Sequence, residues 1–375
     1  MLLPPHRQLL DDLRRDLARG APRLDESPEL EVPVDRYVSP LRFEAERALL
    51  RRLPLMVAHA SEVAAPGSCL RVDWLGTSAV VVRGRDGELR AFLNACRHRA
   101  TQLVDEPACQ KKAFVCPYHG WTYDLTGSLI HIPHEAAFSG IDRARHSLVE
   151  LPVTSAHGFV WLTLTPEGDG DVGALLDGLG ADLDALAFAD HVVFRRTTTV
   201  CRANWKLLIE AFLENYHLRQ LHRDTIYRFF LDGFGACRPD GRHIRALSAR
   251  RTLLEARGEP DLDALRTLTS PSYYLFPNTI LVVHPDYLSH LSIYPEAVDR
   301  LACVHTMLIP RDRQEDRDHW ERSFSLIDGG VFQAEDYKIA EKMHAGITTG
   351  ANTHLTFGRL EQTIRHFHTV LDNAL

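Results

Sequence analysis

The sequence lacks the features that would assign it to a membrane-spanning, secreted or nucleic-acid-binding class. No stretch approaches the roughly 18 consecutive apolar residues that a membrane helix needs, and the first 20 residues have no uninterrupted apolar core typical of a signal peptide. Lys and Arg are scattered and the formal net charge is −7, so no basic surface for nucleic acid is predicted. We therefore expect a cytoplasmic chain with neither a membrane nor nucleic acid as a partner.

Cysteine is also scarce. The seven cysteines are an odd number spread over 375 residues, which is a poor framework for disulfides. Histidine, by contrast, occurs twenty times, and several histidines lie close to Cys, Asp or Glu in the sequence. The chain is 45% hydrophobic and long enough for two globular domains. This composition predicts a globular protein in which Cys and His hold metal.

The order of hydrophobic patterns predicts an α+β protein. A charged amphipathic helix and a Pro-containing arm occupy residues 1–40, and short β-rich runs separated by turn residues predict a compact antiparallel β domain within residues 41–165. A Gly- and Asp-rich linker opens the last segment, residues 166–375. There, a helix at about 204–220, several β runs and two helices at about 313–345 and 358–373 are typical of an antiparallel sheet with helices.

Two short motifs predict a metal centre in the β domain. Cys96-x-His98 is followed, after seventeen residues, by Cys116-x-x-His119. Two thiolates and two imidazoles suit either a tetrahedral zinc ion or a [2Fe–2S] cluster. Zinc knuckles usually separate Cys from His, whereas here each motif contributes one of each, which favours a cluster with the cysteines on one iron and the histidines on the other. Cys109 fits neither spacing, and we expect it to be a free thiol.

The same residues carry a family resemblance. C-x-H-R at Cys96–Arg99 and C-P-Y-H-G-W at Cys116–Trp121 resemble the Rieske signature of the α subunits of Rieske non-haem iron oxygenases, a family of ring-hydroxylating dioxygenases and related monooxygenases and demethylases. The resemblance implies a small antiparallel β domain that binds a Rieske [2Fe–2S] cluster through the two Cys and two His named above. It also implies a helix-grip (START-like) catalytic domain, whose antiparallel sheet is covered by helices.

A second set of candidate ligands lies on the predicted helix at 204–220. Glu210, Glu214 and His217 follow one another at steps of four and three and therefore share one helix face. His217 and His222 are five residues apart, about 140° around a regular helix, so both can bind one metal only if the helix ends or bulges between them. The alternative is that both histidines are solvated or satisfied by other contacts.

The resemblance extends to this segment and supplies a third ligand. Asn204-Trp205-Lys206, an acid three residues before the first histidine, and a second histidine five residues later are similar to the family's iron motif. The family implies a mononuclear Fe(II) bound by two histidines and a later Asp, with positions left open for oxygen. Spacing alone leaves Glu335, Asp336 and Glu341 equivalent, and only the resemblance selects Asp336 as the ligand beside His217 and His222.

The resemblance also implies an electron path and a substrate pocket. In the family, the cluster of one subunit faces the iron of its neighbour in a head-to-tail homotrimer, and Glu214 matches the acid that bridges them, where many members carry Asp. A carboxylate at this spacing could instead only orient His217. The chain departs from the family pattern at His344, because other members more commonly carry a Gln at that position. The segment 273–278, also similar to the family, is expected to line the pocket, with Asn278 in a catalytic role; its alternative is core packing.

The function implied by the resemblance is that of the oxygenase component of a multicomponent system, which uses O2 and electrons from NAD(P)H to hydroxylate or oxidatively dealkylate a small organic molecule. The Gly168-x-Gly170-x-x-Gly173 stretch carries acids that repel a pyrophosphate, so a separate reductase, with or without a ferredoxin, is expected. The chain is shorter than many α subunits that pair with a β subunit, which favours monooxygenation over aromatic ring cis-dihydroxylation. A non-enzymatic Rieske electron carrier and a zinc-stabilised binding module are the alternatives of another class.

Overall fold

The computed structural model describes residues 2–375, which divide into two compact units. The large unit comprises residues 2–47, 176–182 and 192–375, and the small unit comprises residues 48–175 and 183–191. The N-terminal residues, expected to form a helix and an arm packed on the body of the protein, belong to the large unit. No helix in the described part of the chain combines the length and the apolar character needed to cross a bilayer.

The small unit is built from antiparallel sheets. One sheet has the strand order β10-β5-β4-β3-β6, and two three-stranded sheets have the orders β11-β12-β2 and β7-β8-β9. Val80 and Val82, two residues apart on one face of a strand, pack with Phe92 and Trp121 in a single apolar core. The strands are β2 (Leu55–His59), β3 (Ser68–Trp74), β4 (Thr77–Arg83), β5 (Leu89–Leu93), β6 (Ala108–Gln110), β7 (Phe114–Val115), β8 (Thr122–Tyr123), β9 (Leu129–His131), β10 (Glu150–Leu151), β11 (Val153–Ala156) and β12 (Phe159–Leu162).

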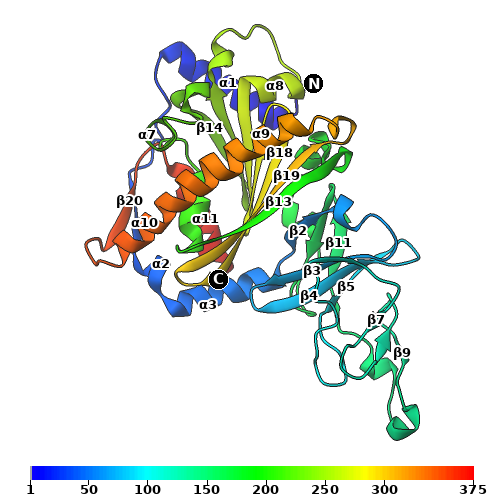
Figure 1. The fold of residues 1–375 in the computed structure, drawn as a ribbon. Helices are drawn as coiled ribbons and strands as arrows, with labels where there is room; N and C mark the ends of the chain where they lie inside the picture. Colours follow the sequence, from blue (N-terminus) through cyan, green and yellow to red (C-terminus); the bar gives the residue numbers. More distant parts are fainter. Residues whose placement is uncertain (1) are drawn as a thin grey trace. The chain divides into compact units, whose positions relative to one another are not determined.

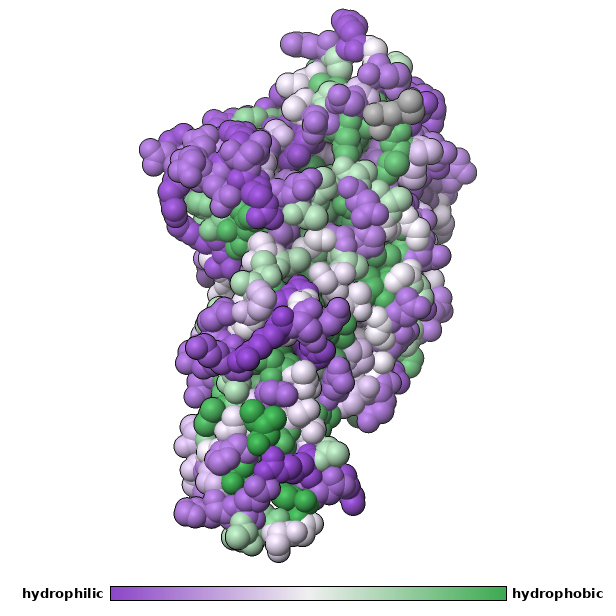
Figure 2. All heavy atoms as spheres, turned by 90° about the vertical axis from the view of Figure 1, so that its right-hand side faces the viewer, coloured by the Kyte–Doolittle hydropathy of each residue, from purple (hydrophilic) through white to green (hydrophobic). Residues whose placement is uncertain are grey.

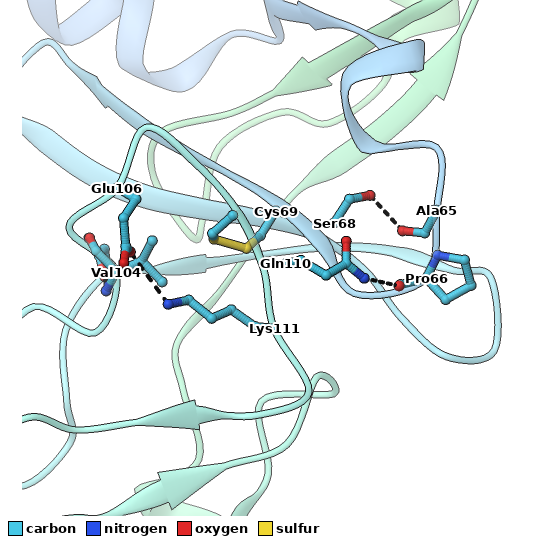
Figure 3. The surroundings of a disulfide bond; sticks show 10 residues. Ala65, Pro66, Ser68, Cys69, Val104, Glu106, Gln110 and Lys111 are labelled. Carbon is cyan, nitrogen blue, oxygen red and sulfur yellow. Dashed lines mark hydrogen bonds and ion pairs between the residues drawn. A yellow bond between two sulfur atoms is a disulfide. The ribbon is translucent and has the colours of Figure 1, made fainter.

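A disulfide bond joins Cys69 of β3 to Cys109 of β6 (Figure 3). The two strands pair antiparallel and place the cysteines directly opposite each other, with Cα atoms 5.1 Å apart, within the range that a disulfide requires. The expectation of a free thiol at Cys109 is therefore wrong. The sequence could not reveal the bond, because the pairing depends on the register of two strands whose cysteines are 40 residues apart.

A seven-stranded antiparallel sheet forms the centre of the large unit, in the order β13-β19-β18-β17-β16-β15-β14. A helical stretch from α9 (Arg317–Phe324) to α10 (Tyr337–Ile347) crosses one face of this sheet (Figure 1). Leu9, Leu10 and Leu13 of α1 (Pro4–Arg19) are fully buried and pack in one cluster with Leu247 of the sheet, which explains why the N-terminus belongs to this unit. The strands of this sheet are β13 (His191–Cys201), β14 (Phe230–Asp240), β15 (His243–Arg250), β16 (Thr269–Leu275), β17 (Thr279–Val283), β18 (Leu288–Ala297) and β19 (Arg300–Pro310). Two further strands, β1 (Leu30–Pro33) and β20 (His354–Phe357), pair with each other in a separate two-stranded sheet.

The helices differ from expectation at two places. The helix expected at 204–220 is broken into two, and the one expected at 313–345 contains a π-helical segment, Ser325–Asp336, between α9 and α10. Such wider turns are frequent at functional sites. The helices are α1 (Pro4–Arg19), α2 (Asp35–Val38), α3 (Pro40–Arg52), α4 (Val172–Leu176), α5 (Gly180–Ala185), α6 (Trp205–Phe212), α7 (Leu218–Leu221), α8 (Leu262–Leu268), α9 (Arg317–Phe324), α10 (Tyr337–Ile347) and α11 (Gln362–Ala374).

The predicted α+β class is confirmed by these elements: antiparallel β-sheets make up the small unit, and an antiparallel sheet with helices makes up the large one. On the visible face of the chain, polar and apolar residues are interspersed (Figure 2). Isolated exposed apolar side chains are ordinary on protein surfaces. The hydropathy of this face therefore does not by itself indicate a functional site.

Candidate metal centres and the cavity beside one of them

Two loops of the small unit repeat one backbone conformation. Cys96 follows β5, and Cys116 follows β7. In each loop the Cys carbonyl accepts the N–H of the residue four positions later, and the Cys N–H donates to the carbonyl five positions later, with N···O distances between 2.8 and 3.0 Å. The fourth residue, Ala100 or Gly120, has a left-handed backbone with φ of +61° or +72°. Two equivalent tight turns thus present the two motifs.

In these loops the two cysteines lie next to each other, and so do the two histidines. Burial raises the pKa of the Cys96 thiol, and the neighbouring Cys116 thiol adds to this effect. The rings of His98 and His119 lie next to each other, with centroids 4.7 Å apart. Nδ1 of His98 is buried and has no hydrogen-bond partner among residues 2–375, so this nitrogen is available to bind a metal. Thiols beside thiols and imidazoles beside imidazoles are the arrangement that a Rieske [2Fe–2S] cluster requires, and this donor set fits it.

Tyr123 adds a contact that the motif spacing did not predict. Its hydroxyl lies 3.3 Å from Sγ of Cys96 and accepts the backbone N–H of Arg97 at 2.9 Å. The Tyr123 side chain is fully buried. Hydrogen bonds to the ligating sulfurs are one of the factors that set the potential of an iron–sulfur cluster. Tyr123 is therefore placed to tune a cluster held by the Cys96 loop.

The broken helix brings the two histidines of the large unit together. α6 ends at Phe212, and the short helix α7 is preceded immediately by His217 and followed immediately by His222. The geometric condition set by their five-residue spacing is met, and the ring centroids are 5.0 Å apart. Glu210, expected on the same face as His217, remains in α6, where it accepts a hydrogen bond from Tyr37 at 2.7 Å.

Asp336 completes a group of three candidate ligands with these histidines. Its Oδ1 lies 3.2 Å from Nε2 of His222 and 3.9 Å from Nε2 of His217, and the ligand atoms of all three residues lie within 4.8 Å of one another. His222 and Asp336 are only 2% and 3% exposed. Asp336 is the last residue of the π-helical segment. Two imidazoles and one carboxylate that converge in this way fit a non-haem Fe(II) site with open positions.

Each histidine of this triad has a carboxylate behind it. Oε1 of Glu214 lies 2.5 Å from Nδ1 of His217, and Oε2 of Glu335 lies 2.6 Å from Nδ1 of His222. Burial lowers the pKa of His222, but hydrogen bonds and charges from Asp336 and Glu335 outweigh it, so the pKa lies above its ordinary value. Both rings therefore turn Nε2 toward Asp336. Spacing alone left Glu335 as an alternative ligand, although its position next to Asp336 could have indicated a supporting contact to a ligand.

A cavity of about 190 Å³ lies beside the triad, which forms part of its wall. Phe212 and Phe332 line it next to the triad and pack edge to face, with centroids 5.5 Å apart. Contrary to expectation, Asn278 and the rest of segment 273–278 do not line this cavity. Asn278 is 1% exposed and donates to the Ile293 carbonyl at 3.1 Å. The reason is topological: the turn between β16 and β17 lies at the far end of the hairpin from the lining residues.

Comparison with known proteins assigns the family. A family model described as the ring hydroxylating alpha subunit (catalytic domain) matches residues 188–375, and one for the Rieske [2Fe-2S] domain matches residues 54–152. The chain belongs to the ring-hydroxylating α-subunit family. The predicted family, the oxidoreductase class and the presence of a Rieske [2Fe–2S] domain and a catalytic domain of the mononuclear iron family are thereby confirmed.

Relatives of this α subunit include two curated monooxygenases. The carnitine monooxygenase oxygenase subunit of Escherichia coli (strain K12) is 29% identical over 360 residues, which cover 91% of this chain and 92% of that protein. The chloroplastic choline monooxygenase of Spinacia oleracea is 28% identical over 323 residues, with 82% and 69% covered. A crystal structure of the quaternary ammonium Rieske monooxygenase CntA in complex with substrate L-carnitine has the same fold, with a TM-score of 0.75, 24% identity and coverage of 92% and 96%.

Membership in the ring-hydroxylating α-subunit family decides between the classes of function. The catalytic-domain match covers the half of the chain that neither an electron carrier nor a zinc-stabilised binding module would explain. Both alternatives are therefore excluded. The protein is an oxygenase subunit, and α subunits of this family work with a reductase.

The family's Asn-Trp-Lys motif has a structural explanation in this α subunit. The Asn204 side chain caps α6 by accepting the N–H of Lys206 at 3.2 Å. Glu46 accepts from Lys206 Nζ at 2.8 and 2.9 Å and from Trp205 Nε1 at 2.8 Å. Burial lowers the pKa of Lys206, and Glu46 opposes that shift. His344, which departs from the common Gln, still accepts the backbone N–H of Asn204 through Nδ1, at 3.3 Å. The motif thus fixes the helix that leads into the triad.

Proposed function

We propose that this α subunit hydroxylates or oxidatively demethylates a small quaternary ammonium compound by monooxygenation. One observation carries the proposal: His217, His222 and Asp336 converge within 4.8 Å at the wall of a cavity with aromatic sides. The faces of aromatic rings attract quaternary ammonium groups. Relatives that cover most of this chain are named as monooxygenases of carnitine and choline, both of which carry such a group.

The ligand assignments are part of this proposal. Cys96, His98, Cys116 and His119 would hold the Rieske cluster, and the triad would hold Fe(II). When bound, the cluster supplies electrons singly and the iron supplies the activation of dioxygen. Other side chains have supporting tasks.

The acids behind the triad histidines fix their orientation. Glu214 and Glu335 engage Nδ1 of His217 and His222, so each ring offers Nε2 to the metal. Without these partners the rings could turn, and the three ligand atoms would no longer converge. Phe212 and Phe332 present apolar surface beside the triad, which excludes water and holds the alkyl groups of a substrate near the metal.

The electron path is proposed from the position of Glu214. Its side chain is 9% exposed, but the neighbouring residue Tyr216 is 62% exposed, so this side of the triad reaches the surface of the large unit. A second copy of the chain can approach there. We therefore propose a homotrimer in which Glu214 bridges the His217 side of one subunit to the cluster of the next. A separate reductase, with or without a ferredoxin, would deliver electrons from NAD(P)H in the cytoplasm.

The experiment is a substrate-dependent oxygen-uptake assay with the Fe(II)-loaded protein and a surrogate reductase. We expect carnitine or choline to stimulate uptake, with a hydroxylated or dealkylated product found by mass spectrometry. Removal of Fe(II) with a chelator should abolish uptake, and restoration should return it. A cis-diol formed from an aromatic acid, with no stimulation by either quaternary amine, would contradict the proposal and favour ring dihydroxylation.

A further inference from the structure

Arg250 is a cationic side chain in the wall of the cavity that holds the triad. It ends β15, where the register places it opposite Phe230 of β14. Its guanidinium carbon lies 5.4 Å from the ring centroids of both Phe229 and Phe230, and its Nη1 donates to Oγ of Ser270 at 3.3 Å. The guanidinium is thus held in place by two rings and one hydroxyl.

This cation has no acidic partner in the described chain. Among residues 2–375, the Arg250 guanidinium donates to the Ser270 hydroxyl and forms no ion pair with a carboxylate. Burial lowers the pKa of Arg250, yet an arginine stays protonated in proteins. Burial, together with the positive charges of Arg250 and Arg266, also keeps the pKa of His284 far below its usual value. Arg250 is only partly exposed, and charges removed from water are normally paired, so this part of the cavity wall lacks a negative charge.

The sheet builds a polar end of the cavity around Arg250. Ser248 and Arg250 are two residues apart on β15, and Ser270 and Ser272 are two residues apart on β16, so each pair shares a strand face. Ser248 pairs with Ser270 in the register, and all four residues line the cavity. Hydroxyl groups and a guanidinium therefore gather on one sheet face. The triad and its phenylalanines supply another part of the same wall.

We infer that Arg250 binds an anionic group, a carboxylate, at the end of the substrate remote from the oxidised carbon. The inference rests on the proposed function and narrows it: the substrate is a quaternary ammonium compound that carries a carboxylate, as carnitine does, and not one without a carboxylate, such as choline. A guanidinium suits this task because its fork of donors matches the two oxygens of a carboxylate. The serine hydroxyls can complete the hydrogen bonding of the same group.

The test is calorimetric titration of the full-length, Fe(II)-loaded protein without oxygen. The probes are γ-butyrobetaine and its neutral carboxamide, which share the trimethylammonium group. The wild type should bind the acid about 10- to 100-fold more tightly than the amide, as for a hydrogen-bonded charge pair. Arg250→Gln should abolish this preference and leave the affinity for the amide unchanged. Arg250→Lys should retain part of it. Arg257→Gln, a change at an exposed arginine outside the cavity, should retain all of it.

Other outcomes overturn either the anchor or the substrate class. An undiminished preference for the acid in Arg250→Gln would refute the anchor. Equal losses for both probes, with a lower unfolding temperature, would show that Arg250 only supports Phe229 and Phe230. A third probe, 5,5-dimethylhexanoate, replaces the ammonium nitrogen by carbon. Arg250-dependent binding of this acid without binding of γ-butyrobetaine would refute the quaternary ammonium substrate and keep the anchor, whereas no Arg250-dependent binding of any carboxylate would refute the anchor.

Discussion

Glu335 should govern how tightly the large unit holds Fe(II), although it is not itself one of the proposed ligands. Its carboxylate lies 2.6 Å from Nδ1 of His222 and also accepts a hydrogen bond from Thr225 at 2.8 Å. Replacement by Ala leaves His222 without this partner. The ring can then rotate and turn Nε2 away from Asp336. We expect Glu335→Ala to weaken Fe(II) binding while the Rieske cluster stays intact.

The magnitude follows from the burial of the pair. His222 is 2% exposed and the Glu335 side chain is 17% exposed, so water cannot readily replace the lost partner. A hydrogen bond to a charged group contributes about 1.5–3 kcal/mol. A loss of ~2 kcal/mol corresponds to roughly a 30-fold rise in the dissociation constant, which agrees with the usual effect of removing the partner of a metal-binding histidine. Glu335→Gln keeps an acceptor oxygen and should cause a smaller rise.

The assay is anaerobic competition for Fe(II) with a chromophoric chelator, and the absorbance of the cluster serves as an internal reference. Glu341→Gln is the matched control, because Glu341 is on the adjoining helix but contacts Arg202 N and Lys338 rather than the triad. It should leave Fe(II) affinity unchanged, and Asp336→Ala should abolish stoichiometric binding. A dissociation constant for Glu335→Ala within threefold of the wild type would refute the reasoning.

Three further predictions concern other contacts. Glu214→Gln keeps an acceptor for His217, so Fe(II) affinity should fall less than about tenfold, whereas single-turnover reoxidation of the reduced cluster should slow by more than that; equal rates would refute the bridge. Lys206→Met breaks a buried pair with Glu46, and urea unfolding should show a loss of ~3 kcal/mol, with Lys338→Met, an exposed change, as the control. Replacing Cys69 and Cys109 together by Ala opens a loop of 40 residues, which should destabilise the small unit by up to ~4 kcal/mol and hasten cluster loss; an unchanged denaturation midpoint would contradict this.

The candidate metal-binding segments could be predicted because each is local in sequence. Both Rieske-type motifs place their Cys and His within three residues, and such short spacings survive whatever fold surrounds them. The five-residue spacing of His217 and His222 also predicted a constraint on the backbone, which the short helix α7 meets. Asp336 was different, since only the family resemblance distinguished it from Glu335 and Glu341.

The errors arose where contacts between distant segments, or the end of a helix, decide which residues lie together. The disulfide of Cys69 and Cys109 depends on the pairing of β3 with β6, which no spacing records. The hydrophobic pattern around Glu210 continued past Phe212, but the chain leaves the helix there and separates Glu210 from His217. Segment 273–278 was expected to line the pocket, yet it lies at the turn of the β16–β17 hairpin, outside the lining of the cavity.

This difference explains why the sequence predicts the chemistry of the protein better than its substrate. The proposed iron ligands flank α7 and lie at the end of one helical segment, whereas another part of the cavity wall takes residues from β15, β16 and the end of β17. On each of these strands only alternate residues face the cavity, so Arg250 and Ser270 resemble surface residues of a β-strand in the sequence. Their shared face becomes evident only from the register. A family resemblance that rests on the ligand motifs therefore identifies the reaction, and the sheet must be known before the charge of the substrate can be inferred.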